Sequence, residues 1–138
     1  MTDDRRPMRS LAFSFTTCAQ PEQVRCALTD GSVTGRYMYG LAAESGWRAG
    51  DPVSFATGHG PALTGEVLHA SERRLSFTLD AAYVTWELAP AEGGTLVILS
   101  VDEPACGEAG DAEAAWRPVL SALEAHLAEA HPAGGDER

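Results

Sequence analysis

The sequence predicts an α+β helix-grip protein, in which a curved antiparallel sheet of about six or seven strands wraps around a long C-terminal helix. Two observations support this fold class. Short apolar runs alternate with polar residues through the middle of the chain, which is the period of half-buried strands. Toward the C-terminus, one helical stripe contains Trp116, Val119, Leu120, Leu123 and Leu127. Because a sheet with one apolar face needs a cover, this helix is expected to pack on the sheet.

The N-terminal part predicts one strand followed by two helical segments. Residues 11–16 alternate apolar and polar side chains, as a strand does. Pro21 suits the first turn of the next helix, where its missing N–H costs nothing. Gly31 is expected to end that helix in a left-handed turn. Residues 32–40 then read as a short second helix or an irregular turn.

The middle of the chain predicts a series of hairpins. The apolar positions of the successive strands are Val53 and Phe55; Leu63, Gly65 and Val67; Leu75, Phe77 and Leu79; Val84, Trp86 and Leu88; and Val97, Leu99 and Val101. Glu92-Gly93-Gly94 is a tight hairpin signal. Residues 104–113 are expected to form a loop, and Pro118 then lies in the opening turn of the last helix or kinks it.

Composition limits the function classes. The 138 residues and 14.6 kDa fit one domain, expected over residues 10–131 with flexible ends at 1–9 and 132–138. A net charge of −10 repels phosphates, which excludes nucleic acid as the expected partner. The sequence has no run of about 20 apolar residues for a membrane span and no signal-peptide pattern, so we expect a cytoplasmic protein. The absence of lysine and the many Ala, Gly and Arg residues suggest a GC-rich bacterial genome.

The sequence carries no pattern typical of a metal site or a catalytic centre. The cysteines and histidines lack ligand spacing; they are Cys18, Cys26, Cys106, His59, His69, His126 and His131. No serine lies in a Gly-x-Ser-x-Gly nucleophile elbow. Asp80 and Glu87 can act as acid or base only if they are buried. We therefore expect no catalytic residues, no metal and no cofactor.

A series of short motifs resembles a known family. They are Ala19-Gln20-Pro21-Glu22-Gln23-Val24-x-x-Ala27-Leu28-Thr29-Asp30-Gly31, Arg36-Tyr37-x-Tyr39-Gly40, Trp47-Arg48-x-Gly50-Asp51-Pro52-Val53, Gly65-Glu66-Val67-Leu68, Arg73-Arg74-Leu75 and Trp116-x-x-Val119-Leu120-x-x-Leu123. Their order and spacing over residues 10–130 resemble the activator of heat-shock-protein ATPase homologues, within the START-like (SRPBCC) superfamily and its birch-pollen-allergen fold. The resemblance implies a cavity between sheet and last helix, used across the superfamily for lipids, sterols, polyketides and aromatic compounds. It transfers no catalytic set.

Aromatic side chains are the candidate ligand-binding residues, because they supply apolar area and, in Tyr and Trp, one polar group. The candidates are Tyr37, Tyr39, Trp47, Phe55, Phe77, Trp86 and Trp116. Tyr37 and Tyr39 fall at a helix-to-strand junction, so one of their hydroxyls is expected at the cavity entrance. Arg36 and Arg48 are the cations that can meet a ligand carboxylate there. The alternative interpretation is that these aromatic residues are ordinary core.

Three function hypotheses follow. The first is a carrier or sensor of a small hydrophobic or aromatic molecule. The second is an enzyme of polyketide-cyclase or hydrolase type, which needs a carboxylate or histidine in the pocket. The third is a protein–protein interaction module with a stress-response or co-chaperone role, working as a homodimer through a sheet edge or helix face. A cavity well above roughly 300 Å³ with convergent polar groups favours the first two, and a filled core with an exposed apolar patch favours the third.

Overall fold

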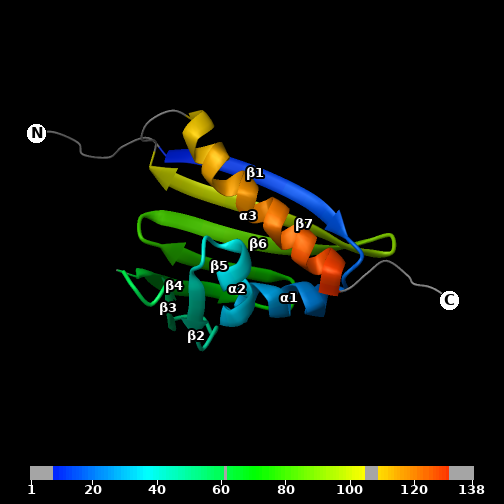
Figure 1. Cartoon of the computed structure of the whole chain (residues 1–138), viewed down its shortest axis with the longest axis horizontal. Helices are drawn as coiled ribbons and strands as arrows, with labels where there is room; N and C mark the ends of the chain where they lie inside the picture. Colours follow the sequence, from blue (N-terminus) through cyan, green and yellow to red (C-terminus); the bar gives the residue numbers. More distant parts are fainter. Residues whose placement is uncertain (1–7, 61, 105–108, 131–138) are drawn as a thin grey trace, which may run out of the picture.

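The computed structural model describes residues 8–60, 62–104 and 109–130 (Figure 1). The flexible ends expected at 1–9 and 132–138 fall outside the described residues, except for positions 8 and 9, which belong to the first strand. Cys106 and His131 also lie outside them.

Seven antiparallel strands form one sheet. In spatial order the strands are β1 (Met8–Thr17), β7 (Gly94–Pro104), β6 (Ala82–Ala91), β5 (Arg74–Leu79), β4 (Leu63–Ala70), β3 (Pro52–Ala56) and β2 (Ala42–Ser45). Together with the C-terminal helix this sheet confirms the predicted α+β fold class. The four-residue strand β2 is an addition, because the sequence pattern did not predict a strand at 42–45.

The predicted alternation sets the two faces of the sheet. Val84, Trp86 and Leu88 on β6 are at most 4% exposed. The apolar positions predicted on β7 are also buried, and Trp86 lies opposite Leu99 in the register between these strands. Ala91 pairs with Gly94 across the predicted tight hairpin, where Gly93 has a φ of +78°. The core therefore lies on the inner face of β5, β6 and β7.

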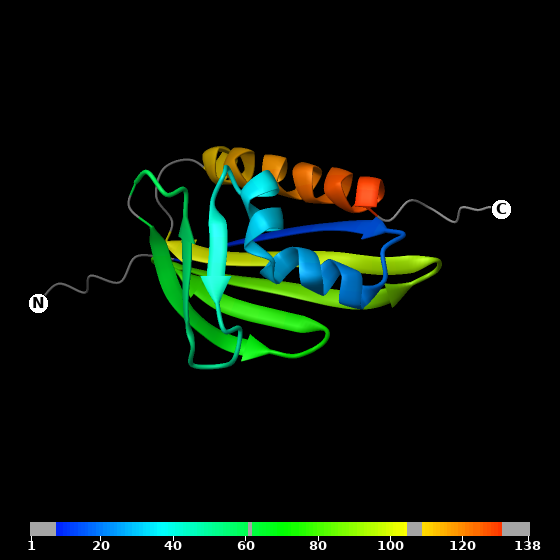
Figure 2. The ribbon, with the colours of Figure 1, turned by 60° about the horizontal axis from the view of Figure 1, so that its bottom comes forward.

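Three helices cover that inner face: α1 (Pro21–Thr29), α2 (Gly31–Tyr37) and α3 (Ala109–Ala130). Figure 2 shows the strands curving around the side on which the helices lie. Helix α3 crosses the sheet, contacts β1 and α2, and buries Leu123 and Leu127 completely. This packing is the one predicted from the apolar stripe of the last helix.

The expectation that Gly31 ends the first helix is wrong. Asp30 follows α1 with an extended backbone, and Gly31 begins α2 instead. The reason is a close approach between elements, since a Cβ on Gly31 would lie 2.6 Å from the backbone oxygen of Ala43 on β2. The Asp30 carboxylate caps α2 by accepting the backbone N–H of Ser32 at 2.9 Å. The hydroxyl of Ser32 donates to the same carboxylate. The hydrogen bonds from the hydroxyl and from the backbone N–H lower the pKa of Asp30.

The start of the last helix also differs from the prediction. Helix α3 begins at Ala109, inside the loop expected over 104–113, so Pro118 lies within the helix and not in its opening turn. Proline has no N–H to donate, so the carbonyl of Ala114 lacks the usual helical partner at this point. Helix α3 therefore has one backbone hydrogen bond fewer, at the junction of its two halves, than a helix without proline.

Candidate ligand pocket

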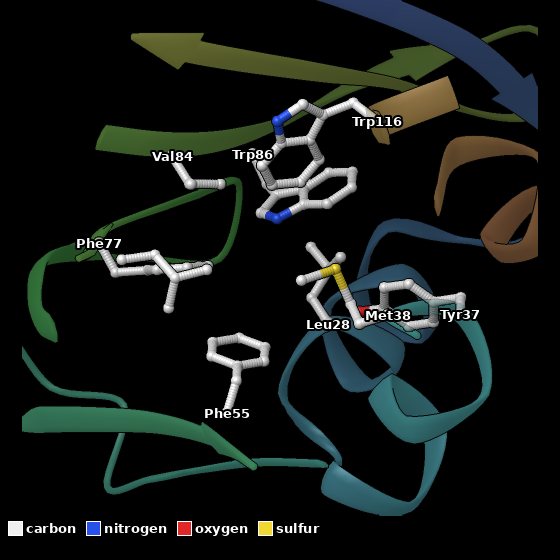
Figure 3. Close-up of a pocket in the computed structure, with 9 residues that line it drawn as sticks. Leu28, Tyr37, Met38, Phe55, Phe77, Val84, Trp86 and Trp116 are labelled. Atoms are coloured by element: carbon white, nitrogen blue, oxygen red, sulfur yellow. The ribbon is translucent and has the colours of Figure 1, made fainter. Parts of the chain in front are cut away.

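An apolar hollow lies between the inner face of the sheet and the helices (Figure 3). Its lining residues come from helices α1, α2 and α3 and from strands β3, β5 and β6. One further lining residue directly follows α2. The lining residues are Leu28, Tyr37, Met38, Phe55, Phe77, Leu79, Val84, Trp86 and Trp116. None of them carries a formal charge, so the hollow favours a neutral, apolar occupant.

The hollow is small in this conformation. The space open to the centre of a water-sized sphere is about 10 Å³, and the total atom-free space, including open solvent, is about 270 Å³. About 10–15 Å³ of such space holds one water molecule, whereas ligand pockets typically span roughly 300–1,000 Å³. As lined by the described residues, this hollow is therefore smaller than the preformed cavity that the ligand-binding hypothesis expects.

Aromatic contacts organise one wall of the hollow. Phe55 on β3 stacks on Phe77 on β5, with ring centroids 5.6 Å apart. Trp47 approaches the same Phe77 ring edge-on at 6.1 Å. Trp47 does not line the hollow itself, so it contacts this wall only through Phe77.

Both tyrosine hydroxyls donate hydrogen bonds within the fold. Tyr37 is buried, and its hydroxyl donates a hydrogen bond to the Ala27 carbonyl at 3.1 Å. This burial raises the pKa of Tyr37 far above its ordinary value. Tyr39 is 62% exposed, and its hydroxyl donates to the carbonyl of Ala115 on α3. Both hydroxyls are thus used to join elements of the fold.

The two tryptophans differ in exposure. Trp86 on β6 is 3% exposed, and its indole N–H has no hydrogen-bond acceptor among the described residues. In Figure 3 its ring nitrogen is on the side facing Phe77, Phe55 and Leu28, toward the centre of the hollow. Trp116 reaches the hollow from α3 and is only half-buried. The hollow is therefore lined by one buried side chain whose N–H has no partner among the described residues and by one half-buried aromatic side chain.

The structure brings most of the predicted aromatic residues together. Those lining the hollow are Tyr37, Phe55, Phe77, Trp86 and Trp116, whereas Trp47 and Tyr39 lie beside it. Four further lining residues were not predicted as site residues; they are Leu28, Met38, Leu79 and Val84. Leu79 and Val84 belong to the predicted strand alternation, and Leu28 to the buried face of the first helix. Met38 has no such periodic signal, because it follows the end of α2.

Charged groups lie away from the hollow. Arg36 and Arg48 are exposed and do not line it. Asp80 is exposed, and Glu87 is half-buried opposite Arg74 in the register, on the outer face of the sheet. Within the described ranges, no group of three His, Cys, Asp or Glu side chains is placed to hold a metal ion. None of the described helices is both long and apolar enough to cross a bilayer.

Comparison with solved structures shows that this fold is shared. A protein from Mesorhizobium loti has 20% sequence identity and a TM-score of 0.75, covering 89% of this chain and 98% of that one. A protein from Rhodobacter sphaeroides has 26% identity and a TM-score of 0.63, covering 89% and 99%. The Aha1 dimer from Colwellia psychrerythraea, a solution structure, has 15% identity and a TM-score of 0.71, covering 86% and 96%.

Comparison by sequence assigns the family. No curated protein sequence matches the chain significantly. The family model described as Activator of Hsp90 ATPase homolog 1-like protein matches residues 18–128, which is most of the chain. The chain therefore belongs to the Activator of Hsp90 ATPase homolog 1-like protein family, and it has the helix-grip fold of START-like (SRPBCC) proteins.

Proposed function

We propose that this protein binds a small hydrophobic or aromatic molecule in the hollow between sheet and helices, as a carrier or sensor. The observation that carries the proposal is the lining itself, which draws apolar and aromatic side chains from both layers and contains no charged group. Aromatic walls of this kind supply large contact area and can stack on a ring. The described part of the chain places no carboxylate or histidine in the lining, so we do not propose the cyclase or hydrolase alternative.

Binding requires the hollow to open, because its free space matches about one water molecule. Met38 and Trp116 are the lining side chains suited to move. Methionine is unbranched with three rotatable bonds, so it adapts to irregular space. Trp116 is half-buried, so its displacement exposes less new apolar surface than that of a core residue. A ligand then enters between α3 and the segment that follows α2.

Two experiments test this function. Native mass spectrometry of protein purified from its own host should detect a co-purifying apolar small molecule. Titration with α-methylstyrene, a neutral ring compound, should change tryptophan fluorescence, whereas benzoate and a nucleotide should not. Tight nucleotide binding without any response to apolar probes would contradict the proposal.

A matched pair of variants localises the binding. Val84→Phe places a larger side chain in the hollow and should weaken α-methylstyrene binding, whereas Tyr83→Phe, on the outer face of the same strand, should not. Denaturant unfolding of both variants shows whether they are folded. Equal binding by both variants would place the probe elsewhere.

A second candidate is self-association through the outer face of the sheet. Leu96 and Ile98 on β7 are half-buried there, beside Ala12 and Ser14 on the edge strand β1. The related Aha1 from Colwellia psychrerythraea is described as a dimer. Sedimentation equilibrium should then report a dimer that Ile98→Asp converts to a monomer. A monomeric wild-type protein at high concentration would exclude this candidate.

A further inference from the structure

We infer that the ligand of this hollow is a neutral ring compound with one hydrogen-bond acceptor, and that the indole N–H of Trp86 is the donor that recognises it. This inference rests on the proposed function and specifies its ligand class. An acceptor of this kind is a ketone, ether or similar uncharged oxygen.

The unpartnered donor of Trp86 carries the inference. Buried tryptophan N–H groups usually find an acceptor, because a buried donor without a partner loses its hydrogen bonds to water. The Trp86 side chain is 3% exposed, and nothing in the described part of the chain accepts its N–H. The nitrogen is not among the atoms that are sealed from solvent, so it keeps a surface on which an acceptor can be placed. The nitrogen faces the hollow (Figure 3), so an occupant of the hollow is in position to supply the acceptor.

The position of this donor is fixed by the sheet. Trp86 lies in β6 between Leu75 on β5 and Leu99 on β7, which are 1% and 0% exposed. Close packing on both sides holds the indole in place. The acceptor of a ligand must therefore lie within hydrogen-bond distance of a donor whose position is fixed. A few polar groups placed in this way orient a ligand in an apolar site.

The other lining groups do not compete for this role. The hydroxyl of Tyr37 is already engaged with the Ala27 carbonyl. Trp116 is half-buried at the outer side of the hollow, where water can satisfy its N–H. The remaining side chains of the lining present carbon, or sulfur in Met38. Among the described lining groups, the Trp86 N–H is thus the donor that remains for one ligand acceptor deep in the hollow.

The lining also excludes a charged ligand and favours a ring. Among the described residues no arginine or histidine lines the hollow, so a carboxylate buried there would lose its hydration without an ion-pair partner from them. Phe55 and Phe77 form a stacked aromatic wall beside the hollow. A flat ring packs against such a wall, with its acceptor directed at the Trp86 nitrogen.

A pair of probes with the same shape isolates the hydrogen bond. Acetophenone has a carbonyl oxygen at the position where α-methylstyrene has a =CH₂ group. Benzoate is the charged probe. Calorimetric titration gives the ratio of the dissociation constants of α-methylstyrene and acetophenone for each protein. In Trp86→Phe this ratio should fall about three- to tenfold from its wild-type value, the effect of one neutral hydrogen bond. In the control Trp116→Phe the ratio should stay unchanged.

The outcomes separate this inference from the proposed function. If both probes bind and Trp86→Phe leaves the ratio unchanged, the inference is wrong and the proposed function stands. If neither probe binds, both are wrong. Tighter binding of benzoate than of acetophenone also overturns the inference.

A measurement on the wild-type protein decides the question where Trp86→Phe does not fold. In a ¹⁵N-labelled sample, the indole N–H resonance of Trp86 should shift downfield with acetophenone and not with α-methylstyrene. Equal shifts with both probes would overturn the role of Trp86.

Discussion

The hydroxyl of Tyr39 donates a hydrogen bond to the backbone carbonyl of Ala115. This bond joins the segment between α2 and β2 to helix α3. Met38 and Trp116, the chain neighbours of the bonded residues, both line the hollow. Pro118 follows within the same helix and has no N–H to donate to the Ala114 carbonyl. The Tyr39–Ala115 bond therefore holds together the side of the hollow that we expect to open.

Removing this hydroxyl should loosen the entrance with a small loss of stability. Tyr39→Phe is expected to lower the free energy of unfolding by about 0.5–1 kcal/mol, because the bond is neutral and Tyr39 is exposed. Amide hydrogen exchange at residues 112–117 should become faster. Tyr83→Phe is the control, since Tyr83 is 49% exposed and its hydroxyl has no hydrogen-bond partner among the described residues. The same exchange rates in both variants would show that the bond does not restrain α3.

Tyr37 should make the protein less stable in alkaline solution. Burial raises the pKa of Tyr37 in the folded state, while the unfolded chain loses this proton near pH about 10. Below that pH both states hold the proton, and the contribution to stability is fully present. Above it only the unfolded state is deprotonated, so this group lowers the free energy of unfolding by about 1.4 kcal/mol per pH unit.

Tyr37→Phe separates this effect from those of other groups. At neutral pH the variant should lose about 1–3 kcal/mol, because the buried Ala27 carbonyl loses its donor. Denaturant unfolding from pH 8 to 11 should then show a shallower alkaline decline than in the wild type. Parallel declines in both proteins would mean that Tyr37 ionises normally when folded.

Two glycines of helix α2 should respond to alanine in opposite directions. Gly31→Ala places a Cβ 2.6 Å from the Ala43 oxygen, so α2 and β2 must separate, and a loss of about 1–3 kcal/mol is expected. In Gly35→Ala the nearest atom, the oxygen of Gly40, is 4.0 Å from the new Cβ. Alanine there should stabilise the helix by about 0.5–1 kcal/mol. Urea unfolding of both variants measures this contrast, and similar effects at the two sites would refute it.

Two apolar residues of α3 should separate core packing from the entrance. Leu127 is fully buried and does not line the hollow, so Leu127→Ala should cost about 2–5 kcal/mol. Trp116 is half-buried, so Trp116→Ala should cost less, about 1–2 kcal/mol. Trp116→Ala should also speed the association of α-methylstyrene, measured by stopped-flow. A larger stability loss for Trp116→Ala than for Leu127→Ala would instead identify Trp116 as a core residue.

The sequence by itself determined the fold class and the faces of most elements. The alternation of Val84, Trp86 and Leu88 is local, and a period of two residues is what a half-buried strand needs. The helical stripe through Leu123 and Leu127 has the period of a helix packed on one side. The folded protein keeps both patterns because the period of each element places its apolar residues on the buried face.

Packing between elements determines which polar groups lack a partner and how much space the hollow has. Tyr39 and Ala115 are 76 residues apart, and no local pattern indicates that the hydroxyl reaches that carbonyl. Gly31 looks like a helix end in sequence, but Asp30 caps a helix that begins there, and the nearby Ala43 oxygen leaves no room for a Cβ. Trp86 has the same place in the strand alternation as its buried neighbours. That its N–H lacks an acceptor among the described residues depends on the atoms that surround it in the fold. Such properties depend on side chains meeting across elements, so they follow from packing and not from sequence periodicity.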